Sequence, residues 1–431
     1  MNRRDFLATS AALPLAGSFL AADMPRSTVP TRDKPPTRKL ALVASTYYYL
    51  SHAYHIGGRF LNGYLKDGKY HFPDLGIAGA YVEQKNASDL SERHSKKHGF
   101  ATYGNIADAL TLGTGKLAVD GVMLICEHGD YPYNAKGQKL YPRYEYFQKI
   151  VEVFRDSKKS VPVFCDKHLS FDRAKGFEMV ATAKKMGFPL LAGSSLPVTW
   201  RRPELELPLG VKIEEALVAS RGELEIIGIH ALEALQCMVE RRTNSQQGVK
   251  SVEYLEGEAV WKAGDAGRWS WNLLEAALGR SPSRNVGDVR ENCAHYPPST
   301  AWGMRLGGPK AFLIEYRDGL KATVLQLDGH VSDDTFAATI VGEKKPVSTL
   351  FWLPPPPGAA FLEALARHVE GFMDTGKAPY PVERTMLTGG ILDHVLESRV
   401  RKKKIDTDDL DVTYAPPKDS GFMRGDYLAP I

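Results

Sequence analysis

Cysteine is scarce in this chain of 431 residues. Its four cysteines lie far apart, with no Cys-x-x-Cys pair and no histidine at zinc-finger spacing; they are Cys126, Cys165, Cys237 and Cys293. This excludes a zinc-finger site and a small fold held together by disulfides. They could pair in an oxidising compartment, but we expect the four to be buried free thiols.

Long hydrophobic runs and an excess of one charge are also lacking. The apolar stretch Leu7–Ala22 falls short of the roughly 20 residues that a membrane-spanning helix needs, so we expect no permanent membrane anchor. The formal net charge is +4, and residues 1–39 carry all of this surplus. An electrically balanced body does not favour nucleic acid as a partner.

The N-terminus has the features of a targeting signal. Arg3 and Arg4 precede Phe6 and a weakly apolar, alanine-rich stretch, a pattern that resembles a twin-arginine export signal. A proline-rich tether follows up to residue 38. We therefore expect residues 1–38 to lie outside the fold, and the protein to work in the periplasm or another extracytoplasmic space. Because this pathway exports folded proteins, it favours an enzyme that receives a cofactor before export.

From residue 39 to about 200, short apolar runs alternate with helical patterns. The predicted strands are Leu40–Ser45, Ile77–Val82, Ala101–Tyr103, Val119–Cys126, Val161–Cys165 and Pro189–Ala192. The predicted helices are Ser88–His98, Asn105–Leu110, Arg143–Ser157 and Phe171–Met186. Such alternation predicts an α/β domain with a Rossmann-like, doubly wound parallel sheet, whose ligands bind at the carboxyl ends of the strands.

Residues 201–431 have a different pattern. Strands are predicted at Val249–Glu258, Ala311–Tyr316, Lys321–Leu327 and Phe336–Val341, and helices at His230–Arg241, Ala359–Asp374 and Arg384–Arg399. Consecutive strands without helices between them predict an α+β domain with a mainly antiparallel sheet. We expect the last helices to pack back on the body.

The first strand does not end in the glycine-rich turn that normally holds a dinucleotide. Ser45 and Thr46 are followed by three tyrosines, and no glycine occurs before Gly57. Ser45 and Thr46 are nevertheless the candidates for phosphate contact at this position. Glu83, after the second strand, is a candidate for a ribose hydroxyl, although a lone acidic residue at a strand end is usually just solvated.

The fourth strand ends in Glu127, His128 and Asp130. A histidine with carboxylates can bind a hard divalent metal or act as acid and base, and Glu127 can also contact a cofactor. The plainer alternative is a polar loop that caps the next helix. The aromatic and basic residues after it suit stacking on a sugar ring, or they simply cover the domain; the candidates for substrate binding are His128, Asp130, Tyr131, Tyr141 and Arg143.

The fifth strand ends in Asp166, Lys167 and His168. A lysine beside an aspartate at a buried strand end is costly unless it is paired or functional, so these three are candidate catalytic residues. A salt-bridged structural lysine is the alternative. Trp200 and Arg201, at the crossing between the domains, are further substrate-binding candidates, and a plain interdomain turn is the alternative. The next helix adds Glu233 as a substrate-binding candidate and His230 as a fourth candidate catalytic residue. For His230 the alternative is a helix cap.

Together these marks resemble the Gfo/Idh/MocA family of oxidoreductases. Segment 162–170, Pro-Val-Phe-Cys-Asp-Lys-His-Leu-Ser, looks like the family's Glu-Lys-Pro strand end. Segment 228–233, Gly-Ile-His-Ala-Leu-Glu, resembles its Gly-x-His-x-x-Asp segment, and 187–193, 375–379 and 382–385 are similar to the following strand and the closing helices. The likeness runs from about residue 40 to 414.

The resemblance implies NAD or NADP, hydride transfer at a sugar or cyclitol carbon, and roles for Lys167 and His230 in substrate binding and proton transfer. Three departures stand out. The glycine fingerprint is missing, His168 replaces the family's proline, and Ile226 occupies the position of a usual catalytic aspartate. Glu225 is adjacent, but we expect it to face elsewhere on a strand.

Three hypotheses follow. The first is an exported oxidoreductase that acts on a carbohydrate or polyol with tightly held NAD(P). The second is a cofactor-free or metal-dependent carbohydrate hydrolase or lyase that uses Glu127, His128, Asp130, Lys167 and His168. The third is a non-catalytic sugar-binding protein. The expected partner is a small-molecule or oligosaccharide substrate, and the resemblance adds a homo-oligomer formed through the C-terminal sheet.

Overall fold

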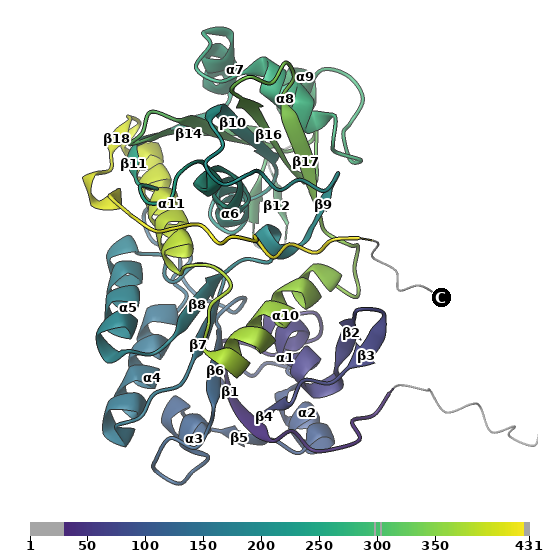
Figure 1. Cartoon of the computed structure of the whole chain (residues 1–431), viewed down its shortest axis with the longest axis vertical. Coiled ribbons are helices and arrows are strands. Elements are labelled where there is room, and N and C mark those ends of the chain that lie inside the picture. The colour runs from purple at the N-terminus through teal and green to yellow at the C-terminus, as the bar shows by residue number, and fades with distance from the viewer. Residues whose placement is uncertain (1–29, 297–298, 302–303, 426–431) are drawn as a thin grey trace, which may run out of the picture.

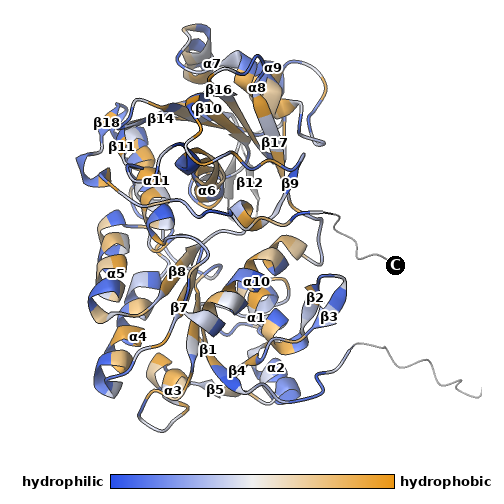
Figure 2. Cartoon of the chain, in the orientation of Figure 1, coloured by the Kyte–Doolittle hydropathy of each residue, from blue (hydrophilic) through white to orange (hydrophobic). Residues whose placement is uncertain are grey.

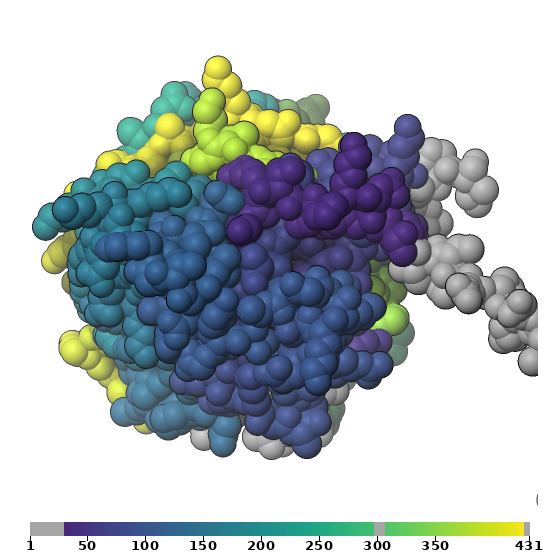
Figure 3. All heavy atoms as spheres, turned by 90° about the horizontal axis from the view of Figure 1, so that it is seen from below, coloured from purple at the N-terminus to yellow at the C-terminus, as the bar shows by residue number. Residues whose placement is uncertain are grey.

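The computed structural model describes residues 30–296, 299–301 and 304–425. The predicted export signal thus lies almost wholly outside the described residues. The described part of the predicted tether lies on the first domain, where Arg32 donates to the carbonyls of Pro73 and Phe60 at 2.6 and 3.0 Å. Figure 3 shows this purple segment against the surface of that domain. Among the described residues, no helix is long and apolar enough to cross a membrane.

The first domain is a doubly wound parallel sheet, as predicted. Its six strands lie in the order β5-β4-β1-β6-β7-β8. They are β1 (Arg38–Ala44), β4 (Leu75–Val82), β5 (Ala101–Tyr103), β6 (Gly121–Ile125), β7 (Val163–Asp166) and β8 (Leu190–Gly193). The helices are α1 (His52–Asn62), α2 (Ser91–His98), α3 (Ile106–Thr111), α4 (Arg143–Ser157) and α5 (Arg173–Met186), and a hairpin joins β2 (Tyr64–Lys66) to β3 (Lys69–His71).

Burial on both faces explains why the central strands are continuously apolar. One face packs on α1 and on α10 (Ala360–Thr375), a helix from the far end of the chain. The other face packs on α3, α4 and α5. The strands of both sheets are largely apolar in Figure 2. All parallel strands therefore end at one edge, and this edge faces the second domain.

Helix α1 was not among the predicted helices. Ser51 caps its N-terminus by accepting a hydrogen bond from the N–H of Tyr54. Gly57 lies against β1 and β4, where an added Cβ would come within 3.3 Å of Ile77 Cδ1. Close helix–strand packing is one of the tasks of the glycine-rich fingerprint. Gly57 provides this close packing here, but the chain lacks the glycines that would let the backbone approach a phosphate.

The second domain is built on a mixed, mostly antiparallel sheet, as predicted. The order of its strands is β18-β11-β14-β15-β10-β16-β17-β9, and β10 and β15 are parallel. They are β9 (Trp200–Arg202), β10 (Ile213–Ser220), β11 (Val249–Glu256), β14 (Pro309–Tyr316), β15 (Lys321–Leu327), β16 (Asp334–Ile340), β17 (Val347–Trp352) and β18 (Ile405–Asp406); β12 (Ser299–Ala301) and β13 (Met304–Leu306) form a separate pair.

Helices cover both faces of this sheet. On one face lie α6 (Gly228–Val239) and α11 (Glu383–Arg401). On the other lie three short helices that the sequence patterns did not predict, α7 (Glu258–Asp265), α8 (Trp271–Leu278) and α9 (Val289–His295). Arg384 of α11 bonds to the Glu240 carboxylate at 2.5 and 2.9 Å, with both side chains fully buried. This pair fixes α11 against the end of α6.

Candidate functional site

The candidate site is a buried cluster of polar side chains at the junction of the two domains, where the carboxyl ends of β1, β6, β7 and β8 meet the turn before α6. We call this junction the interdomain crevice. Two residues here have left-handed backbone conformations that are uncommon without glycine, His128 at φ 66° and Lys167 at φ 60°. The Lys167 N–H bonds to the carbonyl of Gly193 at 3.2 Å and so ties β7 to β8. Strained residues of this kind collect at functional sites, where the surrounding fold holds them in place.

Lys167, the residue after β7, has its ammonium group buried at this junction. Its Nζ lies 3.0 Å from Oε2 of Glu127, whose other oxygen pairs with Arg143. Burial lowers the pKa of Lys167 to about 8, despite the nearby Asp166 carboxylate. A lysine in this state is still mostly protonated at neutral pH and gives up its proton more readily than a surface lysine.

His230, on the first turn of α6, belongs to the same cluster. Its Nδ1 is 2.7 Å from the hydroxyl of Ser194, at the end of β8. Burial, together with the charges of Lys167 and His52, lowers the pKa of His230 well below the ordinary value. The imidazole is therefore neutral at pH 7, and its unprotonated nitrogen can accept a hydrogen bond. The charge of Lys167 thus acts on His230, so the two principal predicted catalytic residues lie near each other at the junction of the two domains.

Asp166, also predicted as catalytic, is paired with a residue that the sequence patterns did not single out. Its Oδ2 lies 2.7 Å from Nδ1 of His52, the first residue of α1. Burial disfavours the charged carboxylate, but His52, Lys167 and Arg143 outweigh it and hold the pKa of Asp166 below its usual value. The carboxylate is thus ionised and accepts the His52 Nδ1–H.

His128 lies beside this pair. Its ring is 5.4 Å from that of His52 and 5.5 Å from that of Tyr48, in edge contacts. Burial lowers its pKa to about 3, so the ring is neutral. Its Nε2 is buried without a hydrogen-bond partner among the described residues. A buried polar atom of this kind calls for a water or a ligand.

Glu225 faces the crevice, and the expectation that it points elsewhere on a strand is wrong. It lies in the turn before α6, with Oε1 3.6 Å from Nε2 of His168. Burial, with repulsion from Glu223, raises the pKa of Glu225 to about 7. His168 is also buried, which lowers its pKa well below the ordinary value. This carboxyl is therefore a third group that can exchange a proton near neutral pH.

The four predicted cofactor residues are all engaged within the protein. The hydroxyls of Ser45 and Thr46 are buried and donate to the Glu127 carbonyl at 2.9 and 3.3 Å. The Glu127 carboxylate is shared by Lys167 and Arg143, and Glu83 accepts a hydrogen bond from Tyr131.

Side chains of the protein also occupy the path that a dinucleotide would take. It would lie across the strand ends, with its pyrophosphate on the N-terminus of α1. The ring of His52 crosses that path to reach Asp166, and Tyr48 lies against His128 beside it. The residues present therefore do not fit NAD or NADP in the usual mode, and the assignment of Ser45, Thr46, Glu83 and Glu127 to cofactor binding stays a prediction.

The predicted substrate residues of the loop after β6 differ in their burial and in their contacts. Tyr141 packs edge-on against Tyr131, with ring centres 5.5 Å apart. Arg143 is fully buried beneath Tyr141 and serves to hold Glu127, although two of its nitrogens lack a hydrogen-bond partner among the described residues. Asp130 is exposed and bonds to Gln84 only through its backbone. Asp130 therefore lies outside the buried cluster.

Three predicted substrate residues have structural roles instead. Arg201 is fully buried and donates to the carbonyls of Leu205 and Pro197 at 2.8 and 3.2 Å. Trp200 is buried against Trp352, with ring centres 5.8 Å apart. Glu233 is buried and accepts bonds from Ser194, Thr385 and Thr388, which joins β8 to α6 and α11. None of the three offers an accessible surface to a substrate.

Two cavities flank the turn that carries Glu225. One, of about 840 Å³, is lined by Tyr133, Glu223, Tyr254, Lys310 and Arg399 among others. The other, of about 720 Å³, includes Arg221 and Ile227 and approaches His230, whose N–H bonds to the Ile227 carbonyl. Both have the size of small-molecule sites.

The metal alternative finds no support in the described residues, where no group of three or more histidine, cysteine, aspartate or glutamate side chains is placed to hold an ion. Different neighbours contact Glu127, His128 and Asp130, as described above, so these three do not form such a group. All four cysteines are buried and free, as expected.

The sequence contained a signal for the position of His52, a residue that the sequence analysis did not single out. Ser51 is a good helix cap, and Ala53, Ile56 and Phe60 follow at helical spacing. Together they predict a helix that starts at the sheet edge, with His52 in its first turn. Glu225 had no such signal, because the orientation of a turn residue depends on the packing of the two domains.

The sequence matches no protein-family model and no curated protein. Solved structures do match. GenD2 from gentamicin A biosynthesis, in complex with NAD, aligns with 87% of this chain and 98% of its own at 10% identity and a TM-score of 0.53. A protein from Sinorhizobium meliloti, assigned as a myo-inositol dehydrogenase, aligns with 86% of this chain and 99% of its own at 13% identity and a TM-score of 0.52.

An oxidoreductase from Agrobacterium radiobacter in complex with NAD+, L-tartaric acid and magnesium also matches. It covers 86% of this chain and 98% of its own at 13% identity, with a TM-score of 0.50. At such identities the likeness concerns the fold. The chain has the two-domain fold of the Gfo/Idh/MocA oxidoreductases.

Proposed function

We propose that this chain is an enzyme that acts on a carbohydrate or polyol in the interdomain crevice, where Lys167 and His230 move a proton to and from a substrate oxygen. The observation that carries the proposal is the buried Lys167 ammonium, held by Glu127 at 3.0 Å in the same cluster as His230. The similar structures include an assigned myo-inositol dehydrogenase, which supports the class of substrate.

Each group has a distinct task. Lys167, with its pKa lowered to about 8, donates a proton to a substrate oxygen or stabilises negative charge on it. Neutral His230 accepts a proton, and Ser194 orients its ring. Arg143 and Glu127 position the ammonium group. Because these groups need no electron acceptor, acid–base chemistry is the function that the geometry supports best.

A second candidate is an NAD(P)-dependent oxidoreductase, favoured by the similar structures that contain NAD. In that case the nicotinamide would supply the hydride acceptor, and Lys167 and His230 would still handle the proton of the substrate hydroxyl. The dinucleotide would have to displace His52 from Asp166, so we assign no step to it.

Export through the twin-arginine pathway is part of the proposal, on the strength of Arg3 and Arg4. Replacing both with lysine should retain the full chain in the cytoplasm of a producing cell, whereas the unaltered chain should reach the periplasmic fraction. Immunoblots of the two fractions test this.

The test of the function is binding and turnover of named polyols and sugars. Calorimetry with myo-inositol, D-glucose and cello-oligosaccharides should detect binding to the purified protein, and NMR should detect a product. Lys167→Met should keep binding within a few fold and lower turnover by about 100-fold or more. Lys184→Met, on an exposed residue of α5, is the matched control.

Binding that is equal in the wild type and Lys167→Met, with no product in either, would indicate the sugar-binding protein of the third hypothesis. Stoichiometric release of NAD from the active protein would indicate the oxidoreductase.

A further inference from the structure

A hollow of about 260 Å³ lies beside α1, separate from the two cavities described above. Three elements line it, namely α1, the β2–β3 hairpin and α10, which come from distant parts of the chain. In Figure 1 these elements lie side by side on the first domain. The lining includes neither Lys167 nor His230, so this hollow is distinct from the candidate site.

The hairpin is an addition to what the parallel sheet requires. A helix of an α/β unit usually joins the next strand through two to six residues, whereas residues 63–74 lie between α1 and β4. The buried Glu370 of α10 accepts a hydrogen bond from the Tyr64 hydroxyl, and its Oε1 lies 2.7 Å from Nε2 of His71. Arg367 donates to the Leu65 carbonyl at 3.0 Å. The hairpin is thus fixed to α10, and it forms a preformed wall of the hollow.

Apolar side chains around the hollow are nevertheless left in solvent. Leu65 and Tyr70 of the hairpin are 49% and 39% exposed. Tyr49, just before α1, is 58% exposed, and its ring packs edge-on against that of Tyr54 with ring centres 5.3 Å apart. Exposed apolar side chains that gather around a hollow mark a binding site.

Polar groups lie among these rings. Asn62 and His55 line the hollow from α1, and Glu363 lines it from α10. Burial, with the charges of Arg59 and His52, lowers the pKa of His55 to about 4, so its ring is neutral at pH 7. Arg59 and Glu363 are the charged residues of the lining, and their charges are opposite. A lining that is balanced in charge and rich in hydrogen-bonding groups favours a neutral polar ligand over an ion.

The spacing of the rings indicates the shape of this ligand. Tyr54 and Asn62 lie about 12 Å apart along the axis of α1, at about 1.5 Å per residue. Tyr70 lies at the Asn62 end, where its hydroxyl donates to the Asn62 carbonyl at 2.7 Å. The two tyrosine rings therefore suit a ligand longer than a single sugar ring. A sugar has C–H faces that pack on aromatic rings and hydroxyl groups that bond to amide, imidazole and carboxylate groups.

We propose that this hollow binds a neutral oligosaccharide, with two of its sugar rings against Tyr54 and Tyr70 and its hydroxyl groups bonded to Asn62, His55 and Glu363. The proposal goes beyond the proposed function, because no residue of the hollow takes part in the reaction. A site of this kind keeps a long carbohydrate on the domain that carries the candidate catalytic lysine.

Calorimetry with neutral tetrasaccharides of different linkage tests the proposal, and the probes are cellotetraose, xylotetraose, maltotetraose and laminaritetraose. We expect the wild type to bind at least one of them. Tyr54→Ala and Tyr70→Ala should weaken this binding by about tenfold or more, because each removes a packing surface. Tyr144→Ala, on α4 at the other face of the sheet, is the matched control and should bind as the wild type does.

Gly58→Leu tests the same site without removing a side chain. An added Cβ at Gly58 has only Asn62 Nδ2 within 4 Å, at 3.9 Å, and leucine is a better helix former than glycine. The new side chain should therefore fill the hollow in a folded protein and weaken binding by about tenfold or more. Turnover of a small substrate should stay at the wild-type level in this variant, because the hollow lies apart from the candidate site.

Two results would overturn the proposal. Tetrasaccharide binding that is equal in the wild type, Tyr54→Ala and Gly58→Leu would place the ligand elsewhere on the molecule. An absence of binding for all the tetrasaccharides would also overturn it. Neither result affects the proposed function, which depends on turnover of small substrates and its loss in Lys167→Met. Far-UV circular dichroism identifies any variant that unfolds, and Gly58→Leu then decides in place of the tyrosine variants.

Discussion

Single residues of the crevice carry most of the functional argument, because burial has changed their acid–base properties. Lys167 follows β7, His230 lies on α6, and Glu225 lies in the turn before α6. Burial lowers the pKa of the first two and raises that of the third. Perturbed groups that converge on a cleft are typical of active sites. Each perturbation predicts a measurable pH dependence.

Lys167 should set the alkaline limb of activity. With a pKa of about 8, the ammonium form predominates below that pH and is lost above it. If the ammonium is the proton donor, turnover should fall about tenfold per pH unit above roughly pH 8. The pH–rate profile measures this. A limb that stays flat to pH 10 would contradict the role of Lys167 as donor.

Glu225 should make folding stability depend on pH. Its folded pKa of about 7 lies above that of an unfolded glutamate, so the folded state keeps a proton that the unfolded state loses between about pH 4.5 and 7. The wild type therefore loses stability as the pH rises through this window. Glu225→Gln should be more stable than the wild type by on the order of 2–3 kcal/mol at pH 8, and by almost nothing at pH 4. Urea unfolding at both values tests this.

At the scale of elements, the sequence was most informative where the local pattern and the tertiary packing agree. Strand Ala101–Tyr103, helix Arg143–Ser157 and strand Lys321–Leu327 were predicted with the bounds that the structure has. The short helices α7, α8 and α9 were missed. Helices of eight residues or fewer gain little from their own periodicity and depend on the sheet beneath them, which a local pattern does not reveal.

The packing of α7 gives an element-scale prediction. A Cβ on Gly264 would lie 2.4 Å from the ring of Trp269, a fully buried side chain that donates to the Val260 carbonyl. Because this ring has no room to shift, Gly264→Ala should destabilise the protein by about 1–3 kcal/mol. Gly371→Ala, in α10 with nothing within 4 Å of the added Cβ, should cost nothing or stabilise slightly. Chemical denaturation of both variants compares them, and equal midpoints would contradict this packing.

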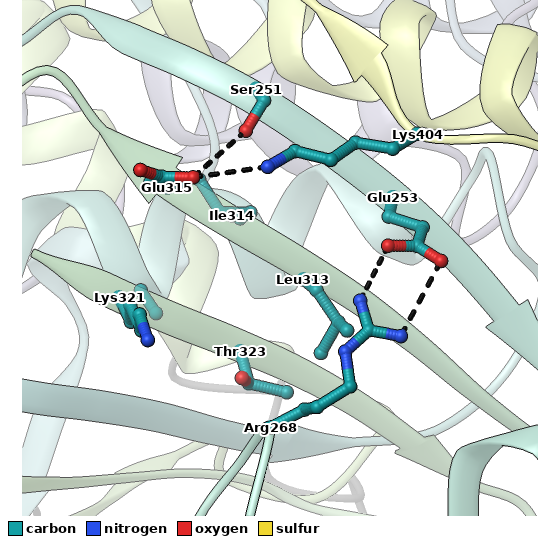
Figure 4. Close-up of a pocket in the computed structure, with 10 residues that line it drawn as sticks. Ser251, Glu253, Arg268, Leu313, Ile314, Glu315, Lys321, Thr323 and Lys404 are labelled. Atoms are coloured by element: carbon teal, nitrogen blue, oxygen red, sulfur yellow. Dashed lines mark hydrogen bonds and ion pairs between the residues drawn. The ribbon is translucent and has the colours of Figure 1, made fainter. Parts of the chain in front are cut away.

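At the scale of the whole molecule, the second sheet bears on the expected homo-oligomer. Helices α7–α9 cover much of the sheet face opposite the one on which α6 and α11 pack. The remaining open strip is charged. In Figure 4, Arg268 pairs with Glu253 and Lys404 with Glu315, the latter at 3.1 Å, and Lys321 lies nearby. Interface cores are usually depleted of charged residues.

We therefore expect the purified chain to be mainly monomeric at micromolar concentration, because this strip offers little apolar area to a second copy. Light scattering coupled to size exclusion measures the mass, with 47.6 kDa as the value for one full chain. A stable dimer that Glu253→Ala or Lys321→Glu disrupts would instead support the homo-oligomer through the C-terminal sheet.

The central claim is that the chain's own side chains fill the dinucleotide path, so that the crevice works on a sugar by proton transfer. The most direct measurement is mass spectrometry of the small molecules released when the folded, purified protein is denatured. The account predicts no nicotinamide dinucleotide above background. NAD or NADP released in an amount equal to the protein would contradict it.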